Sequence, residues 1–204
     1  MTPLNLTAYP KVLVKQRHEL GEWVGFETRN KFEITDESGR SIGFAAEQQK
    51  GLLGFLLRQF LGHWRTFEIH VFGLDRHPAL VARQPFRFIF QRLEVFGTEG
   101  EKLGAIQQRF AILSKRFDVE DRMGQVIMEV SSPLLKFWTF PFVRGGAQVA
   151  CVQKKWTGLL AEAFTDKDTF LVDFSEGSLP EEERSLVLAA ALFIDLRYFE
   201  RKAR

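Results

Sequence analysis

The sequence is poor in cysteine, tyrosine and proline: its 204 residues include one cysteine, two tyrosines and seven prolines. A single cysteine, Cys151, cannot form an internal disulfide bond or supply a thiolate cluster for zinc. We therefore expect a reducing compartment, or indifference to redox conditions, and a cysteine that packs as a small hydrophobic side chain. Because 45% of the residues are hydrophobic and low-complexity tracts are absent, the composition excludes collagen and a long disordered tail.

Long hydrophobic runs are also missing. The two longest apolar stretches, residues 51–61 and 186–194, are both shorter than the roughly 18 residues that a membrane-spanning helix needs. The first residues contain no basic start followed by an apolar stretch and a small-residue cleavage site, so we expect no signal peptide. The sequence therefore predicts a protein located in the cytoplasm.

Motifs of conventional enzymes are absent. The sequence has no Gly-x-Ser-x-Gly elbow, no phosphate-binding glycine loop ending in Lys-Ser/Thr and no dinucleotide fingerprint. The four histidines, His18, His63, His70 and His77, lack the spacing of a zinc site. Lys and Arg number 28 against 26 Asp and Glu, which is too balanced for a nucleic-acid groove. We therefore expect no hydrolase, transferase or redox enzyme, and no nucleic-acid partner.

Short segments of alternating polar and apolar residues fill most of the chain. Phe32 and Ile34 alternate with polar neighbours, a turn signal follows at residues 36–39, and residues 41–47 resume the alternation, which predicts a hairpin. Further strands are expected at residues 11–15, 66–72, 88–96, 102–108, 111–118, 125–130, 148–155 and 169–174. Many short strands separated by turns are typical of a barrel or a sandwich, and we find no linker that would divide the chain.

The C-terminal segment breaks this pattern and predicts a helix. Pro180 followed by three glutamates favours a helix start, with Ser178 as the candidate cap. Residues 186–194 are apolar on every face, and such a helix must be buried by protein or lipid. Because nine residues cover only about 14 Å, we expect this helix to fill a barrel rather than to span a membrane.

Four stretches together resemble the phospholipid scramblase family: GFETRNKFEI at residues 25–34, FAAE at 44–47, WTGLLAEAFTDKDTF at 156–170 and LFIDLRYFE at 192–200. The resemblance runs through nearly the whole chain, in the family's order and spacing. It implies a mainly β fold similar to the Tubby C-terminal domain, a closed antiparallel barrel of about twelve strands around a buried hydrophobic C-terminal helix.

The resemblance also implies a domain organisation. We expect a short tail at residues 1–10 and a single domain at residues 11–204, with its C-terminal helix at residues 180–203. Eukaryotic members carry a proline-rich N-terminal region and a cysteine cluster that accepts palmitate. The corresponding stretch here, ARQPFRFIFQ at residues 82–91, has no cysteine, which suggests a bacterial relative without lipid anchoring.

The function implied by the resemblance is ATP-independent, calcium-stimulated, bidirectional movement of phospholipids between leaflets. We expect a protein peripheral to the cytoplasmic face of the membrane, with anionic lipid as its partner. The alternative is a module that binds a lipid headgroup or a protein and does not translocate lipid. Convergence of Arg65, Arg83 and Arg87 on one concave face would favour headgroup binding.

The family's proposed calcium loop corresponds to residues 166–177. Compared with an EF-hand, two aspartates occupy the first and third ligand positions, but phenylalanines occupy two later ones and the turn glycine is missing. A weak Ca²⁺ site is the most that such a loop provides, and the alternative is a turn and a strand whose side chains face the core. The candidate calcium ligands are Asp166, Asp168 and Glu176.

Residues 50–65 form an apolar segment punctuated by glycines and flanked by cations and tryptophan. These are features of a segment that lies in a bilayer interface. Residues 58–92 carry six arginines against Glu68 and Asp75, which favours anionic lipid. The alternative is a helix packed on the barrel or an interface between copies of the chain. The candidate lipid-contact residues are Leu52, Leu53, Phe55, Leu56, Arg58, Trp64, Arg65, Arg83 and Arg87.

Overall fold

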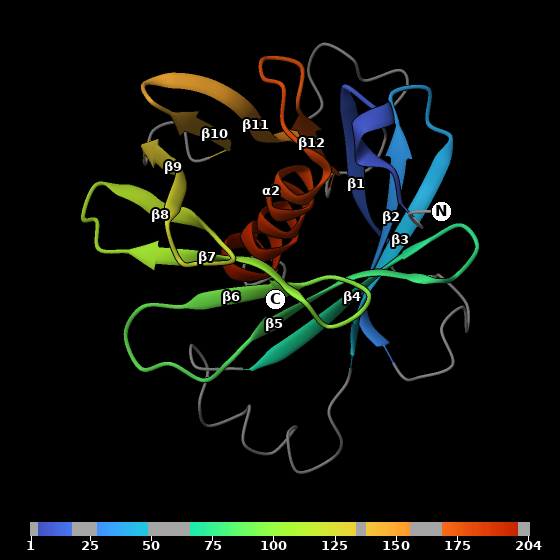
Figure 1. The fold of residues 1–204 in the computed structure, drawn as a ribbon, viewed down its shortest axis with the longest axis horizontal. Coiled ribbons are helices and arrows are strands. Elements are labelled where there is room, and N and C mark those ends of the chain that lie inside the picture. Colours follow the sequence, from blue (N-terminus) through green and yellow to red (C-terminus); the bar gives the residue numbers. More distant parts are fainter. Residues whose placement is uncertain (1–3, 18–27, 49–65, 134–137, 156–168, 200–204) are drawn as a thin grey trace.

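Twelve strands form one closed antiparallel barrel in the computed structural model of the chain, which describes residues 4–17, 28–48, 66–133, 138–155 and 169–199 (Figure 1). The strands are β1 (Lys11–Arg17), β2 (Thr28–Asp36), β3 (Ser41–Gln48), β4 (Phe67–Gly73), β5 (Pro78–Gln84), β6 (Arg92–Phe96), β7 (Lys102–Arg109), β8 (Ser114–Asp121), β9 (Val126–Pro133), β10 (Thr139–Arg144), β11 (Ala147–Lys155) and β12 (Thr169–Asp173). Each strand pairs with its neighbours in the sequence, and β12 pairs with β1 to close the barrel. The predicted mainly β barrel is confirmed.

Alternation along the strands follows the prediction where one face is turned to the core. In the predicted hairpin of β2 and β3, Phe32 and Ile34 are buried at 1% and 0% exposure. The turn between these strands is held by Asp36, whose carboxylate accepts hydrogen bonds from the Ser38 hydroxyl and from the Ser38 and Arg40 backbone N–H groups. The Ser38 hydroxyl bond is the largest of the influences that hold the pKa of Asp36 below its ordinary value.

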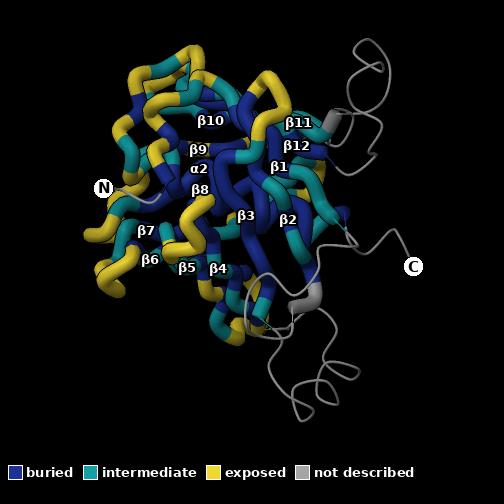
Figure 2. The backbone as a smooth tube through the Cα atoms, turned by 90° about the vertical axis from the view of Figure 1, so that its right-hand side faces the viewer, coloured by how far each residue is buried: buried dark blue, intermediate teal, exposed yellow. Residues whose placement is uncertain are grey.

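The α-helix α2 (Glu181–Ile194) runs through the inside of the barrel (Figure 1). Every residue from Ser185 to Ile194 is buried, so the apolar segment is covered by the strands on all sides, as its length predicted (Figure 2). A π-helical turn, η4 (Asp195–Phe199), continues it. The predicted cap is wrong: the N-cap is Pro180, with an extended backbone and no side-chain cap, because the helix begins two residues later than a cap at Ser178 requires.

Residues 4–9, which include the short 3₁₀ helix η1 (Leu6–Ala8), pack against the start of α2. Leu6 is fully buried, and its N–H donates to Glu181 Oε1 at 2.9 Å. Arg184 Nη1 donates to the backbone carbonyls of Leu6 and Tyr9 at 2.9 and 2.8 Å. These contacts close one end of the barrel over the first turn of the helix.

The two ends of the barrel differ. At one, which we call the turn end, tight hairpins join β2 to β3, β4 to β5, β6 to β7, β8 to β9 and β10 to β11. At the other, the loop end, residues 85–91 join β5 to β6 and residues 110–113 join β7 to β8. Four other strand pairs also have their ends at the loop end. In the sequence, the residues between them are 18–27, 49–65, 134–137 and 156–168, which lie outside the described residues.

Two predicted strands begin too early in the sequence. β6 starts at Arg92 and β8 at Ser114, so residues 88–91 and 111–113 belong to loops. The reason is pairing: β5 and β6 share only three residue pairs, from Val81 with Phe96 to Arg83 with Glu94, and residues before Arg92 have no partner in β5. Strands β5 and β10 were not among the predicted ones, and Pro141 lies within β10, paired with Cys151.

Candidate functional site

Exposed hydrophobic side chains gather at the loop end. Of the ten large hydrophobic side chains that are exposed in the described part of the chain, seven lie in the two connections there. We call these seven the hydrophobic rim: Phe86, Phe88, Ile89, Phe90, Phe110, Ile112 and Leu113. The sequence pattern did not indicate this set, because five of the seven residues fall within the expected strands at residues 88–96 and 111–118.

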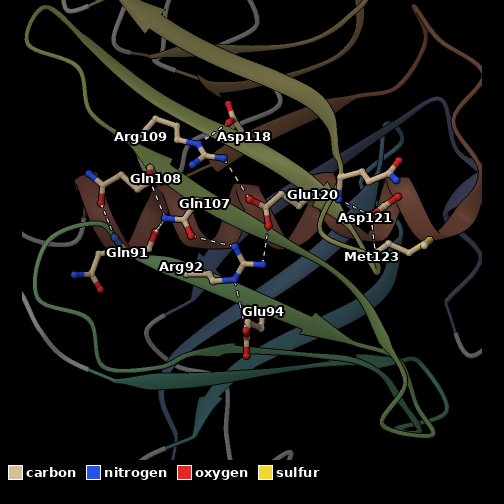
Figure 3. Close-up of polar contacts among 11 residues, drawn as sticks. Gln91, Arg92, Glu94, Gln107, Gln108, Arg109, Asp118, Glu120, Asp121 and Met123 are labelled. Atoms are coloured by element: carbon tan, nitrogen blue, oxygen red, sulfur yellow. Dashed lines mark hydrogen bonds and ion pairs between the residues drawn. The ribbon is translucent and has the colours of Figure 1, made fainter.

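A chain of glutamines holds the two connections side by side. Gln91, at the end of the first connection, is 1% exposed, and its Nε2 donates to the Arg87 carbonyl at 3.0 Å. The N–H of Gln91 donates to Gln108 Oε1 at 3.2 Å, and the Gln108 N–H donates back to the Gln91 carbonyl at 2.9 Å (Figure 3). Gln84 Nε2 donates to Gln91 Oε1 at 3.0 Å. The bases of both connections are therefore fixed relative to each other.

Next to the glutamines, an ion-pair network crosses β6, β7 and β8 (Figure 3). Arg92 donates to Glu120 Oε2 at 2.7 Å and to Gln107 Oε1 at 3.0 Å. Arg109 donates to Asp118 Oδ2 at 2.6 Å and to Glu120 Oε1 at 3.4 Å. Because the Arg92 and Glu120 side chains are only 13% and 9% exposed, this pair is screened little by solvent. The network ties together β6, β7 and β8, three of the four strands that carry the rim.

Replacing Arg92 with methionine is expected to lower the free energy of unfolding by about 2 kcal/mol, because Glu120 would lose its shorter cationic contact while remaining largely buried. The matched control is Arg116→Met, since the Arg116–Glu129 pair is 48% and 63% exposed. That control should change the free energy by less than about 0.5 kcal/mol. Urea unfolding followed by circular dichroism measures both, and equal losses would show that the network does not stabilise these strands.

The helix reaches the loop end in a cluster of aromatic rings and lysines. Phe199 stacks on Trp138 with ring centroids 5.0 Å apart and meets Phe170 edge-on. Lys115 Nζ lies 4.3 Å from the ring centroid of Tyr198, and Lys154 Nζ lies 4.4 Å from that of Phe199. Burial raises the pKa of the Tyr198 hydroxyl, so this group stays neutral. The mouth of the barrel is thus aromatic and positively charged.

The turn end has the opposite character. A cavity of about 380 Å³ opens there beside the first turn of α2, between the start of the helix and the turn after β6. Its lining includes three carboxylates, Glu101, Glu181 and Glu182. Such a lining repels anions from this cavity.

The predicted lipid-contact residues divide into two groups. Leu52, Leu53, Phe55, Leu56, Arg58, Trp64 and Arg65 lie outside the described residues. Arg83 lies on β5, where its Nε is 3.2 Å from Glu68 Oε2 and its guanidinium carbon is 5.2 Å from the Phe96 ring centroid. Arg87 is exposed in the β5–β6 connection, among the aromatic residues of the rim.

Of the candidate calcium ligands, Asp166 and Asp168 lie outside the described residues. Glu176 is exposed at the turn end, where its Oε2 accepts a hydrogen bond from Gln148 at 2.8 Å. The whole of β12 lies between Glu176 and the two aspartates, and its alternate residues Phe170 and Val172 are buried. In the part of the chain that the structure describes, no group of three His, Cys, Asp or Glu side chains is arranged to hold a metal ion.

Among the described helices, none has the length and apolar character required to cross a membrane. This finding applies to α2 as well, whose apolar residues are already covered by the strands.

Several known proteins are similar to this chain over nearly its whole length. Altered inheritance rate of mitochondria protein 25 of Saccharomyces cerevisiae is 25% identical over 236 residues, covering 96% of this chain and 72% of that protein. Phospholipid scramblase 1 of Homo sapiens is 25% identical, covering 96% of this chain and 64% of that protein. Phospholipid scramblase 2 of Bos taurus is 26% identical, covering 96% and 70%. The sequence model of the Scramblase family matches residues 3–201, nearly the whole chain, and the chain therefore belongs to the scramblase family.

Proposed function

We propose that this protein moves phospholipids between the two leaflets of a membrane, in both directions and without ATP. The observation that carries the proposal is the family match over residues 3–201. Two of the relatives that cover 96% of the chain are named phospholipid scramblases. The difference between the two ends of the barrel also supports a lipid partner, because the loop end combines exposed hydrophobic side chains with cations.

The proposed place of action is the cytoplasmic face of a membrane, to which the protein binds peripherally. The buried state of α2 supports peripheral binding, because the apolar residues of this helix are already packed in the barrel. We include residues 50–65, Arg83 and Arg87 as proposed lipid contacts. Anionic phospholipid is the proposed partner, since Arg87 is exposed and the sequence has no Asp or Glu between residues 85 and 91.

Calcium stimulation is proposed to act through Asp166 and Asp168. Two neighbouring carboxylates supply only part of the six to eight oxygens that calcium takes, so the affinity should be weak. Glu176 remains in the proposal as a third carboxylate, but the strand β12 lies between it and the aspartates. We therefore expect a smaller effect from Glu176→Gln than from the pair Asp166→Ala and Asp168→Ala.

The test is the accessibility of NBD-labelled lipid to dithionite in liposomes that contain the purified protein, with and without millimolar calcium and with no nucleotide. Translocation makes inner-leaflet NBD lipid accessible, so dithionite should bleach fluorescence beyond the outer-leaflet fraction that empty liposomes lose. The wild type should show this extra loss with calcium, and the Asp166→Ala/Asp168→Ala variant should show less. Glu176→Gln should reduce the extra loss less than the aspartate pair does.

Each outcome separates parts of the proposal. Extra loss that is equal with and without calcium keeps translocation and contradicts the calcium site. A loss no greater than in empty liposomes, with protein incorporation confirmed, contradicts translocation. In that case the alternative, a peripheral module that binds lipid headgroups or a protein, becomes the better account.

A further inference from the structure

The hydrophobic rim is unusual in its clustering. Ile112 and Leu113 are 76% and 77% exposed, and Phe88 and Ile89 are 69% and 75% exposed in the neighbouring connection. Single exposed hydrophobic side chains are ordinary on protein surfaces, but a contiguous group marks a surface that contacts a partner or a membrane. The three remaining large exposed side chains lie at the turn end in two different hairpins, Leu74 between β4 and β5, and Met123 and Val126 in the β8–β9 hairpin.

The two connections that carry the rim, and the residues that flank the second, contain charged side chains of positive sign only. Residues 85–91 and residues 109–117 contain no Asp or Glu. Arg87 is exposed between Phe86 and Phe88, whereas Arg116, three residues after the second connection, lies 3.3 Å from Glu129 Oε2. Arg109 is neutralised by Asp118, and Lys115 lies over the Tyr198 ring. Apolar side chains flanked by cations suit the boundary between acyl chains and anionic headgroups.

The rim is mounted on a fixed base. The Gln91–Gln108 pair exchanges a side-chain and a backbone hydrogen bond between the two connections. Gln84 joins the same group, and Gln84 and Gln91 are only 3% and 1% exposed. Because the two bases are held together, both connections can enter a membrane surface at once without first being ordered against each other.

A bilayer fits this surface better than a second copy of the chain. Two copies that met rim to rim would bring cations against cations, because neither connection carries an acid. The acidic turn end would be the complement of the rim in a head-to-tail contact, but among the described residues it exposes only three large hydrophobic side chains, divided between two hairpins. An anionic bilayer offers both an apolar interior and negative headgroups to the same surface.

We infer that the hydrophobic rim is the part of this protein that inserts into an anionic phospholipid membrane, so that the loop end of the barrel faces the bilayer and the acidic turn end faces away. The inference rests on the proposed action on phospholipids and names the surface that it uses. It assigns membrane contact to two connections that are separate in sequence from residues 50–65.

The test is flotation of the full-length protein with vesicles of phosphatidylcholine, alone or mixed with phosphatidylserine. The rim variant carries Ile89→Asp and Ile112→Asp, one charge in each connection. The matched control carries Leu74→Asp and Met123→Asp, at positions 63% and 77% exposed at the turn end. We expect the rim variant to bind mixed vesicles about tenfold or more weakly than wild type, and the control to bind as wild type does.

A second pair of variants tests the charge. Arg87→Glu in the first connection should weaken binding to mixed vesicles but change binding to phosphatidylcholine vesicles little. Arg122→Glu, exposed in the β8–β9 turn, is its control and should leave both unchanged. Thermal unfolding of each variant identifies any that fails to fold, and a rim variant that fails is replaced by Ile89→Ser with Ile112→Ser.

Insertion is measured directly with a fluorophore on a single cysteine. Cys151 is 5% exposed and burial raises the pKa of its thiol, so it reacts slowly. It is replaced by alanine so that the introduced cysteine is the single site of labelling. NBD attached at Ile112→Cys should shift to the blue with mixed vesicles, whereas NBD at Met123→Cys should not. Equal shifts at both sites, or no shift at Ile112→Cys, would overturn the inference.

Other results separate this inference from the proposed function. Wild-type protein that binds through the rim but does not bleach inner-leaflet NBD lipid supports the rim and contradicts translocation. Translocation that is equal in wild type and the rim variant contradicts the rim and leaves the function standing. A wild-type dimer that the rim variant converts to a monomer, with vesicle binding unchanged, would make the rim an interface between copies and overturn the inference.

Discussion

The Ala190→Asp variant is expected to leave the barrel largely unfolded, with a loss of about 5 kcal/mol or more in the free energy of unfolding. Ala190 lies in the middle of the run from Ser185 to Ile194, in which every residue is buried, and its exposure is 0%. A carboxylate there would lose its hydration without a cation to pair with, and even the neutral acid would add volume to a packed core. This loss is comparable to the whole free energy of unfolding of a domain of ordinary stability.

The measurement is urea or thermal unfolding followed by circular dichroism, together with the soluble yield. Glu182→Ala is the control in the same helix, at an exposed position, and should change the free energy by less than about 0.5 kcal/mol. Ala190→Ser, a smaller polar change at the buried position, should fall between the two. Unaltered unfolding of Ala190→Asp would mean that the helix does not lie inside the barrel in solution.

Gly104→Ala is expected to lower the free energy of unfolding by about 3 kcal/mol or more. Gly104 lies in β7 opposite Asp121 of β8 and Val95 of β6. A Cβ atom there would stand 2.2 Å from the Glu120 carbonyl oxygen and 3.0 Å from Leu186 Cδ1 at the start of the buried helix. Since the nearest atom belongs to the backbone of a paired strand, the strands must separate or the helix must shift.

The control for this change is Gly100→Ala in the turn between β6 and β7. Gly100 has φ of +82°, and nothing lies within 4 Å of the place that an alanine methyl group would take, so only the backbone conformation resists the substitution. Its cost should be about 1 kcal/mol. Chemical unfolding of both variants tests the difference, and an equal loss would show that close contact between β7, β8 and α2 is not what requires glycine at position 104.

The two ends of the barrel give the molecule a direction. The N-terminal segment and the glutamates at the start of α2 close the turn end, where Glu181 accepts hydrogen bonds from the N–H groups of Leu6 and Thr7. The lysine and aromatic cluster around Tyr198 and Phe199 marks the loop end. The arrangement supports a protein that meets an anionic surface with one particular end.

Hairpin structure was readable in the sequence wherever polar and apolar residues alternate in a constant phase. Phe67, Ile69 and Val71 were predicted to share one face of a strand, and all three are buried in β4. The phase of the alternation changes within residues 88–96, where the predicted strand began too early. The exposed Phe88 and Phe90 occupy even positions, whereas the buried Leu93 and Val95 occupy odd ones, so one regular strand cannot hold all four on the core side.

The candidate site was less predictable than the fold. Arg83 and Arg87 were assigned to one cationic surface, but Arg83 is engaged by Glu68 and Phe96 on the strands, and only Arg87 stands among the rim residues. Contacts such as the pair of Gln91 and Gln108 join residues 17 positions apart, and no local pattern indicates them. The aspartates proposed for calcium lie outside the described residues, so that hypothesis still rests on the sequence.

The sequence by itself determined the mainly β barrel, the burial of the apolar helix and the family, because alternation, a short all-apolar run and family-specific stretches are local properties of the chain. Only the tertiary structure decided which hydrophobic residues stay in solvent. An aromatic residue in a strand and one in a connection look alike in sequence, and strand pairing determines which is which. The hydrophobic rim exists because β6 begins at Arg92 and β8 at Ser114, where pairing with neighbouring strands starts, and leaves seven large apolar side chains beyond the sheet.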